Sequence, residues 1–306
     1  MNTERASPRY SKIDVWDASD ILDCILEGQF AAVAAVHAAR PAIVSAALAM
    51  EERLQHRGRL AYAGAGTSGR LGVQDGAELI PTFGWPEHRL LLLIAGGQGA
   101  LLRSVEGAED DVGEAMRQIE VHNLGADDVL VAISASGTTP FTLASMREAK
   151  RRGALTVGIA NNSGTPILKE SNYPIWLDTG SEPIAGSTRL KAGTAQKITL
   201  NALSSLLMIL LGKVYEGLMV DVRVSNEKLA RRGEEMLVQL TACSHRQARD
   251  ALRRSDGSVK VAALLLHGYE LEEAIKLLDR SKGQLRGALD LIDTKPPTEQ
   301  KYVLGD

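Results

Sequence analysis

The sequence predicts an α/β protein: a doubly wound parallel sheet flanked by helices, followed by a small C-terminal helical module. Five short apolar runs end in small residues and show no polar alternation, which is typical of buried parallel strands. Helical patterns separate these runs, and alternation of strand with helix is typical of βαβ units. Beyond Ser225 the strand-like runs stop, and only helical segments follow.

The elements are expected in this order along the chain. Two helices come first, at about residues 18–39 and 41–55, the second with Pro41 in its first turn. The five strands are expected in LAYAGAG, LLLLIAGG, VLVAISASG, LTVGIANN and PIWLDTG, which start at residues 60, 90, 129, 155 and 174. The helices between them are expected at about residues 70–80, 112–120, 141–152 and 166–171. A long apolar helix at about 192–214 follows, and then four shorter ones at about 227–240, 245–254, 259–267 and 270–282.

These elements suggest three regions: N-terminal helices that pack on the sheet domain (1–56), the α/β domain itself (57–224) and the helical module (225–306). KPPTEQ, which begins at Lys295, is expected to be a loose tail. The sequence shows no evident short repeat.

The composition argues against several classes of partner. The net charge is −3 with both signs interspersed, and aromatic residues make up 4%, so neither a nucleic-acid surface nor a set of base-stacking side chains is expected. Cys24 and Cys243 lie far apart in no metal-binding spacing, so no disulfide framework and no metal site are expected. The polar start lacks the apolar core of a signal peptide, and the run from Ala202 to Leu211 is too short to span a bilayer. We therefore expect a cytoplasmic protein without membrane segments.

A glycine-rich turn follows the first expected strand. GAGTSGRLG, from Gly64 to Gly72, contains G-x-G-x-x-G, the pattern of dinucleotide-binding turns. Such folds also need an acidic residue at the end of the second strand, to bind the ribose hydroxyls. Here the second strand ends in glycines, so a dinucleotide-dependent oxidoreductase is the least favoured interpretation.

A second turn of similar chemistry follows the third strand. Hydroxyl groups crowd at two strand-to-helix turns, where free N–H groups and the positive helix end favour a phosphate. The first turn offers Gly66, Thr67, Ser68, Gly69 and Arg70, and the second offers Ser134, Ser136, Gly137, Thr138 and Thr139. For one such turn, simple N-capping by Ser or Thr is the more common role. For two turns at one edge of a sheet, we favour a sugar-phosphate site.

Several motifs occur together in family order: GAGTSGRLG, IAGG, VEGAED, SASGTTP, STRLKAGTAQK, LMVDV and SNEKL. Together they resemble the N-acetylmuramic acid 6-phosphate etherases, members of the sugar isomerase (SIS) superfamily. The likeness runs from TER at Thr3 through the helical tail. It implies an SIS-type sheet, no metal or organic cofactor, and a homodimer. It also implies cleavage of the D-lactyl ether of N-acetylmuramate 6-phosphate, by elimination and then hydration, to N-acetylglucosamine 6-phosphate and D-lactate in cell-wall recycling.

Carried over by position, the family's proton-donating glutamate falls on Glu78 and its second catalytic glutamate on Glu109. Apolar neighbours of Glu78 would favour its protonated form if they also desolvate it, and two carboxylates in different environments can divide acid and base roles. Without the resemblance, the acidic run around Glu109 would be taken as a solvated helix start. Ser187, Thr188 and Lys191 are plausible further pocket residues, although an exposed position is the more common one for lysine.

The sequence departs from the family at two places. Many members have an arginine where Thr138 stands, and DGAELIPT replaces their DASECPPT, with changes at Gly76, Ala77, Leu79 and Ile80. These departures leave the reaction class in place and bear on the fit of the substrate. Two alternatives within the superfamily stay open: a regulator that binds a sugar phosphate without turnover, and an aldose–ketose isomerase. The regulator would not need the two glutamates, whereas only product analysis separates the isomerase.

Overall fold

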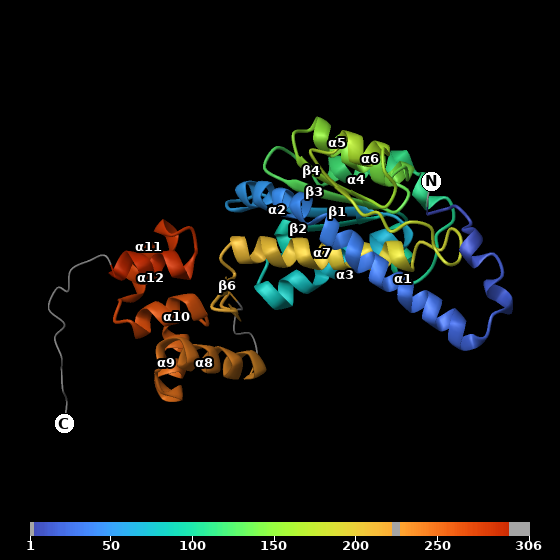
Figure 1. Cartoon of the computed structure of the whole chain (residues 1–306). Helices are drawn as coiled ribbons and strands as arrows, with labels where there is room; N and C mark the ends of the chain where they lie inside the picture. The colour runs from blue at the N-terminus through green and yellow to red at the C-terminus, as the bar shows by residue number, and fades with distance from the viewer. Residues whose placement is uncertain (1–2, 222–226, 294–306) are drawn as a thin grey trace, which may run out of the picture. The chain divides into compact units, whose positions relative to one another are not determined.

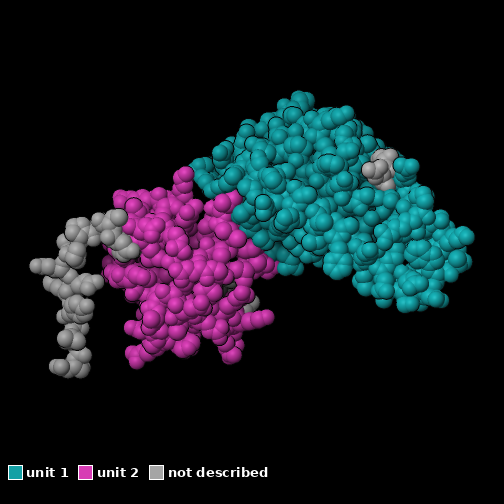
Figure 2. Space-filling model, in the orientation of Figure 1, with its two compact units in different colours: residues 1–80, 85–207 teal, residues 81–84, 208–306 magenta. Residues whose placement is uncertain are grey.

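The computed structural model describes residues 3–221 and 227–293, and the chain divides into two compact units (Figure 2). Unit 1 comprises residues 1–80 and 85–207, and unit 2 comprises residues 81–84 and 208–306. The sequence placed the start of the helical module at residue 225, whereas the compact units divide within the long apolar helix. The segment with KPPTEQ lies outside the described residues.

Unit 1 is built on a five-stranded parallel sheet with the order β2-β1-β3-β4-β5. The strands are β1 (Leu60–Gly64), β2 (Leu90–Ile94), β3 (Val129–Ser134), β4 (Leu155–Ala160) and β5 (Tyr173–Trp176). Every residue of β1, β3 and β4 is buried, as the unbroken apolar runs predicted. Because β1 lies between β2 and β3, the loops that follow these strands meet at one edge of the sheet.

Helices cover both faces of the sheet (Figure 1). The helices are α1 (Ala18–Ala38), α2 (Arg40–Leu54), α3 (Gly66–Phe83), α4 (Val112–Val121), α5 (Pro140–Arg151), α6 (Pro166–Glu170) and α7 (Lys191–Leu210). On one face, Ile119 of α4 and Met146 of α5 pack against Ala61 and Leu130 of the sheet. On the other face, Gly72 and Gly76 of α3 lie directly against the sheet side chains, because a Cβ at either position would meet Tyr62. The doubly wound arrangement is therefore confirmed.

A buried carboxylate joins α3 to the sheet and to α7. Asp75 accepts hydrogen bonds from the hydroxyl of Tyr62 (2.8 Å), from Nδ2 of Asn201 (2.7 Å) and from Oγ of Ser204 (3.2 Å). Burial raises the pKa of Tyr62 well above its ordinary value, and the carboxylate beside it acts in the same direction. These hydrogen bonds of Asp75 hold α3 in register with β1 and α7.

In its described residues, unit 2 contains a short hairpin and five helices. The hairpin pairs β6 (Val214–Tyr215) with β7 (Leu218–Met219), and its turn places Glu216 and Gly217 at positive φ. The helices are α8 (Glu227–Thr241), α9 (His245–Arg254), α10 (Val259–Leu266), α11 (Leu271–Arg280) and α12 (Leu285–Asp293). The sequence analysis did not predict α12, and it placed the end of α7 at residue 214, which is the first residue of β6.

Two helix pairs of unit 2 are each joined by a turn of the same kind. Ser255, between α9 and α10, donates from Oγ to the carbonyls of Leu252 and Ser258 at 3.1 and 2.9 Å. Ser281, between α11 and α12, makes the corresponding bonds to Leu278 and Gln284 at 3.0 and 2.8 Å. Both serines begin a Ser-x-Gly sequence whose last two residues have positive φ. The expectation of no short repeat is therefore wrong for this region.

The helix α1 carries an unusual exposed face. Four large apolar side chains follow one another at helical spacing with exposed fractions of 55, 50, 76 and 53%: Leu22, Leu26, Phe30 and Val33. Among the described residues, α1 is also the one helix long and apolar enough to cross a membrane by length and composition, a test that core helices of soluble proteins pass as well. The exposed acidic residues Asp20, Asp23 and Glu27 lie along the same helix.

Candidate functional site

The glycines of the first turn allow β1 and α3 to touch. A Cβ on Gly69 would lie 2.7 Å from the carbonyl oxygen of Gly64, and Gly66 has a φ of +53°. The pattern G-x-G-x-x-G is thus explained by backbone contact and one left-handed residue. These backbone requirements account for the glycines at the start of α3 without a nucleotide.

The side chains of this turn face the start of α7. Ser68 is buried and donates to Oε1 of Gln196 at 2.8 Å, and Gln196 donates in turn to Oδ1 of Asn161 at 2.9 Å. A Cβ on Gly193 would lie 3.2 Å from the carbonyl of Thr188 and 3.5 Å from Cγ2 of Thr67. The structure therefore brings the predicted residues Thr67 and Thr188 together around Gly193.

Arg70 binds the loop that follows β2. Its guanidinium donates to the carbonyls of Ala100 (2.9 Å), Leu101 (3.3 Å) and Arg103 (3.5 Å). Two of these carbonyls belong to the 3₁₀ helix η4 (Gly97–Leu101). In this structure Arg70 shapes the wall beside the turn, and its assignment to a phosphate stays a prediction.

The second turn gathers its hydroxyl groups into one cluster. Ser134 and Thr139 lie 2.8 Å apart between their hydroxyl oxygens, and Ser136 lies 3.2 and 3.3 Å from them. The N–H groups of Gly137 and Thr138 donate to Ser134 and Ser136. Thr139, the N-cap of α5, makes no side-chain hydrogen bond to the helix. The simple capping role is therefore not what these hydroxyls perform.

The loop after β4 supports this cluster from behind. The carbonyl of Ala135 accepts from the N–H of Asn161 (3.1 Å) and from Nδ2 of Asn162 (2.9 Å). Gly137 has a φ of +73° and stands so close to Thr165 that a Cβ would lie 2.2 Å from its Oγ1. The sequence did not single out Asn161, Asn162 or Gln196, since buried amides after a strand carry no motif of their own.

Glu182 fixes the start of α7. Its buried carboxylate accepts from the N–H groups of Lys191 (3.0 Å) and Ala192 (2.9 Å). The Lys191 side chain is itself buried and lies against Gly28 of α1, where a Cβ would be 3.0 Å from its Cδ. Burial lowers the pKa of Lys191, while the carboxylate of Glu182 acts in the opposite direction. Lys191 thus lies between α1 and the 182–190 loop, on which Ser187 and Thr188 are half-buried.

Glu109 lies beside the second turn. It is exposed on the short helix η5 (Ala108–Asp110), which packs against α5. Its neighbour Ala108 packs on a small cluster that includes Ala95, directly after β2, and Phe141, in the first turn of α5. The following Asp111 caps α4 by accepting from the N–H of Glu114 at 2.8 Å. The capping role that acidic residues favour thus belongs to Asp111, while Glu109 stands at the loop edge of the sheet.

Glu78 lies at the opposite edge. In the first turn of α3, a Cβ on Gly69 would lie 2.9 Å from Ile94, the last residue of β2. Two turns later, a Cβ on Gly76 would lie 3.3 Å from Leu90, the first residue of β2. At 1.5 Å per residue, Glu78 stands about 18 Å along the helix from the start of α3. Within one chain, the structure does not bring Glu78 to the two turns or to Glu109.

The surroundings of Glu78 are open. Its side chain is exposed, as are those of Ala77 and Ile80, and Leu79 alone turns into the core. The side chain of neither Glu78 nor Glu109 forms a hydrogen bond or ion pair with another described residue. The apolar enclosure suggested by the sequence is therefore not formed by the residues next to Glu78 in the chain. The described residues also contain no group of three or more His, Cys, Asp or Glu side chains able to hold a metal ion.

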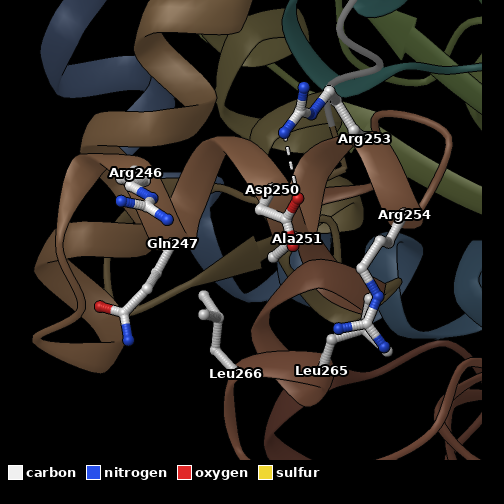
Figure 3. Close-up of a pocket in the computed structure, with 8 residues that line it drawn as sticks. All are labelled: Arg246, Gln247, Asp250, Ala251, Arg253, Arg254, Leu265 and Leu266. Carbon is white, nitrogen blue, oxygen red and sulfur yellow. Dashed lines mark hydrogen bonds and ion pairs between the residues drawn. The ribbon is translucent and has the colours of Figure 1, made fainter. Parts of the chain in front are cut away.

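A hollow on unit 2 contains none of the predicted site residues (Figure 3). It is lined by residues of α9 and α10: Arg246, Gln247, Asp250, Ala251, Arg253, Arg254, Leu265 and Leu266. Inside it, Arg253 is paired with Asp250 at 3.0 Å. The arginines that line this hollow belong to unit 2, whereas the hydroxyl-rich turns belong to unit 1.

Comparison with known proteins defines the family. A protein from Deinococcus radiodurans called N-acetylmuramic acid 6-phosphate etherase is 48% identical over 94% of this chain and 94% of its own. The chain belongs to the N-acetylmuramic acid 6-phosphate etherase family. A second member, from Yersinia pestis, is 43% identical over 94% of this chain and 98% of its own.

Two domain models match the part of the chain that forms the sheet. A model described as the glucokinase regulatory protein N-terminal SIS domain matches residues 42–150, and one described as the SIS domain matches residues 109–206. The solved phosphoheptose isomerase from Francisella tularensis is 20% identical, with a TM-score of 0.48 over 63% of this chain and 100% of its own. With the five-stranded parallel sheet, the domain matches confirm the expected SIS-type fold of this etherase-family member.

Proposed function

We propose that this protein cleaves the D-lactyl ether of N-acetylmuramate 6-phosphate with water, giving N-acetylglucosamine 6-phosphate and D-lactate. The observation that carries the proposal is the pair of hydroxyl-rich turns at one edge of an SIS-type sheet, in a chain 48% identical to a named etherase. The same substrate places the protein in the recycling of cell-wall amino sugars. Because a charged sugar phosphate crosses a bilayer poorly, the proposed location is the cytoplasm.

The second turn is the proposed phosphate site. Its hydroxyls and the uncapped first turn of α5 offer neutral donors and a positive helix end. The first turn, with Gly66, Thr67, Ser68 and Gly69, flanks the sugar, and Ser187 and Thr188 close the side toward α7. Thr138 is exposed at the rim of this turn, so its hydroxyl is proposed as a weaker contact to the phosphate.

The chemistry needs two proton-transferring groups. In the open-chain sugar the aldehyde acidifies the hydrogen at C2, and a carboxylate removes it. The electron pair then forms the C2–C3 double bond while the C3–O bond breaks, and a carboxylic acid protonates the departing lactate oxygen. Water adds back with its oxygen at C3 and a proton at C2. We assign Glu109, beside the phosphate turn, to the transfer at C2, and Glu78 to the lactate oxygen.

The separation of the glutamates supports a site shared by two chains. Glu109 lies at the loop edge and Glu78 near the opposite edge, separated by about the length of β2, roughly 17 Å. A single sugar carbon pair cannot contact both carboxylates at that separation. We therefore propose a homodimer in which Glu78 of one copy reaches the turns of the other. The exposed face of α3 that carries Glu78 is open to such an approach.

A second exposed surface supports self-association. The apolar face of α1, formed by Leu22, Leu26, Phe30 and Val33, repeats along the helix, so it can pack on the same face of another copy across a two-fold axis. The acidic residues beside it disfavour an anionic membrane surface as its partner. Covered in a dimer, this face would no longer be exposed to water.

Product analysis tests the proposal. D-lactate is followed with a lactate dehydrogenase couple, and N-acetylglucosamine 6-phosphate is identified in the same sample by mass spectrometry. Both products are expected without added metal or nucleotide. If the sugar phosphate binds and no lactate is released, the protein is a regulator, and an isomerised product without lactate would indicate an aldose–ketose isomerase.

A further inference from the structure

We propose that Thr3 is a positioning residue that ties together the two loops closing the sugar-phosphate site. The inference rests on the proposed function, because these loops carry Ser134–Thr139 and Ser187–Thr188. Thr3 precedes the first long helix by fifteen residues, yet it is completely buried, with 0% of its surface exposed. Most polar side chains buried in this way make hydrogen bonds, and those of Thr3 are made with one partner.

Thr3 and Asn162 form a reciprocal pair. The N–H of Thr3 donates to Oδ1 of Asn162 at 3.3 Å, and Nδ2 of Asn162 donates to Oγ1 of Thr3 at 2.8 Å. Both polar atoms of the amide are therefore used by one residue, which fixes its orientation. A valine in place of Thr3 would keep the shape of the side chain and remove one of the acceptors of Asn162 Nδ2.

Asn162 transmits this contact to the phosphate turn. Its Nδ2 also donates to the carbonyl of Ala135 at 2.9 Å. In the sequence, Ala135 lies between Ser134 and Ser136, whose hydroxyls belong to the turn. The carbonyl of Asn162 accepts from Oγ1 of Thr165 at 3.3 Å, the residue against which Gly137 packs. Thr3 is thus two hydrogen bonds away from the backbone of the turn.

The backbone of Thr3 reaches the other loop. Its carbonyl accepts from the N–H of Gly186 at 3.2 Å, directly before Ser187. Gly186 has a φ of +77°, a conformation that only glycine adopts readily, and the N–H of Thr188 donates to its carbonyl at 2.9 Å. One buried residue therefore links the loop with Ser187 and Thr188 to the turn with Ser134 and Ser136.

Such a link matters because ligand hydroxyls and phosphate oxygens are recognised by groups held within about 0.5 Å of their productive positions. Both loops are irregular backbone, and the sheet holds only the beginning of the second turn. A loosened Thr3 contact should weaken binding of the sugar phosphate more than it slows the chemical step, because Thr3 touches neither glutamate.

The chain offers a matched control. Thr156 in β4 is also completely buried, and its N–H and hydroxyl both bond to Oδ1 of Asn172, at 3.0 and 2.8 Å. It stands at the beginning of β4, away from both loops. Thr156→Val removes a comparable buried hydroxyl and reports the effect of lost stability alone.

The experiment compares Thr3→Val, Thr3→Ser and Thr156→Val with the unaltered full chain. Lactate release gives KM and kcat, and calorimetry gives the Kd of N-acetylglucosamine 6-phosphate. Thr3→Val should raise KM and Kd about tenfold while kcat changes by less than about threefold. Thr3→Ser, which keeps the acceptor, should stay within about twofold of the unaltered chain in both constants, as should Thr156→Val. Thr3→Ala is measured in parallel and carries the same test if Thr3→Val does not fold.

Each outcome separates the two proposals. If the unaltered chain releases lactate and Thr3→Val leaves KM and Kd unchanged, the role of Thr3 is refuted while the etherase function stands. An equal rise in Thr156→Val also refutes it, because lost stability would then account for the effect. If the unaltered chain binds the sugar phosphate without turnover, the etherase function fails and the Kd values still decide the role of Thr3. If it binds nothing, both proposals fall.

Discussion

Glu78 and Glu109 offer a direct test of how the site is assembled. Each replacement by Gln should lower lactate release by about 10²- to 10⁴-fold, the usual effect of removing a general acid or base. In one chain the carboxylates stand roughly 17 Å apart, the length of five strand residues, so a site built in trans uses one from each copy. A heterodimer of Glu78→Gln with Glu109→Gln then contains one site with both carboxylates intact and one with neither. Its activity should recover to about half that of the unaltered dimer.

The assay uses two differently tagged chains, co-expressed and purified through both tags so that only heterodimers remain. Both homodimeric variants and a dimer carrying Glu87→Gln, another exposed carboxylate, are measured beside it. The first two should stay inactive and the third should keep full activity. A heterodimer as inactive as its parents would refute the trans arrangement, since two sites built within single chains would each lack one carboxylate.

Three further predictions concern assembly and stability. Phe30→Asp should convert the proposed dimer to a monomer in analytical ultracentrifugation, whereas Val121→Asp on α4 should not, although Val121 is 65% exposed against 76% for Phe30. An unchanged dimer in Phe30→Asp would exclude the α1 face from the interface. Gly69→Ala should lower the free energy of unfolding by about 2 kcal/mol or more in urea titrations, because its Cβ would lie 2.7 Å from a carbonyl oxygen, and a smaller loss would mean that α3 shifts freely. Asp128→Ala should cost about 3 kcal/mol, since this buried carboxylate accepts four hydrogen bonds from Arg59 and from the N–H of Gly125. Burial alone would raise the pKa of Asp128, but the hydrogen bonds from Arg59 and the two backbone N–H groups hold this pKa below its ordinary value. The stabilisation from the Asp128 carboxylate is therefore complete above the ordinary pKa and is lost as the pH falls through the folded-state pKa. In acid titrations, Asp128→Ala should not show this loss of stability.

The local patterns of the chain were informative where one segment determines its own structure. Unbroken apolar runs located all five strands of the sheet, and the start of α9 at His245 follows from the capping serine before it. The repeat in unit 2 is visible in the sequence, because Leu252, Arg254 and Ala262 around the first Ser-x-Gly turn recur around the second as Leu278, Arg280 and Ala288. The turn itself is visible only through matching hydrogen bonds and positive φ values.

The site divides in the same way. The sequence alone predicted the two hydroxyl-rich turns. It also predicted that both lie at one edge of the sheet, because the carboxyl ends of parallel strands lie at the same edge. Only the tertiary structure decided that Ser68 donates a hydrogen bond to Gln196 and that Arg70 donates to the carbonyl of Ala100. It also decided that Asn162 and Thr3 pair beside the turn proposed to bind phosphate. These contacts join residues more than a hundred positions apart or on unrelated loops, and no local pattern encodes them. The position of Glu78 in space could not be predicted from its motif either. Because α3 runs along β2 from its last residue towards its first, Glu78 lies near the far edge of the sheet, out of reach of the two turns in its own chain.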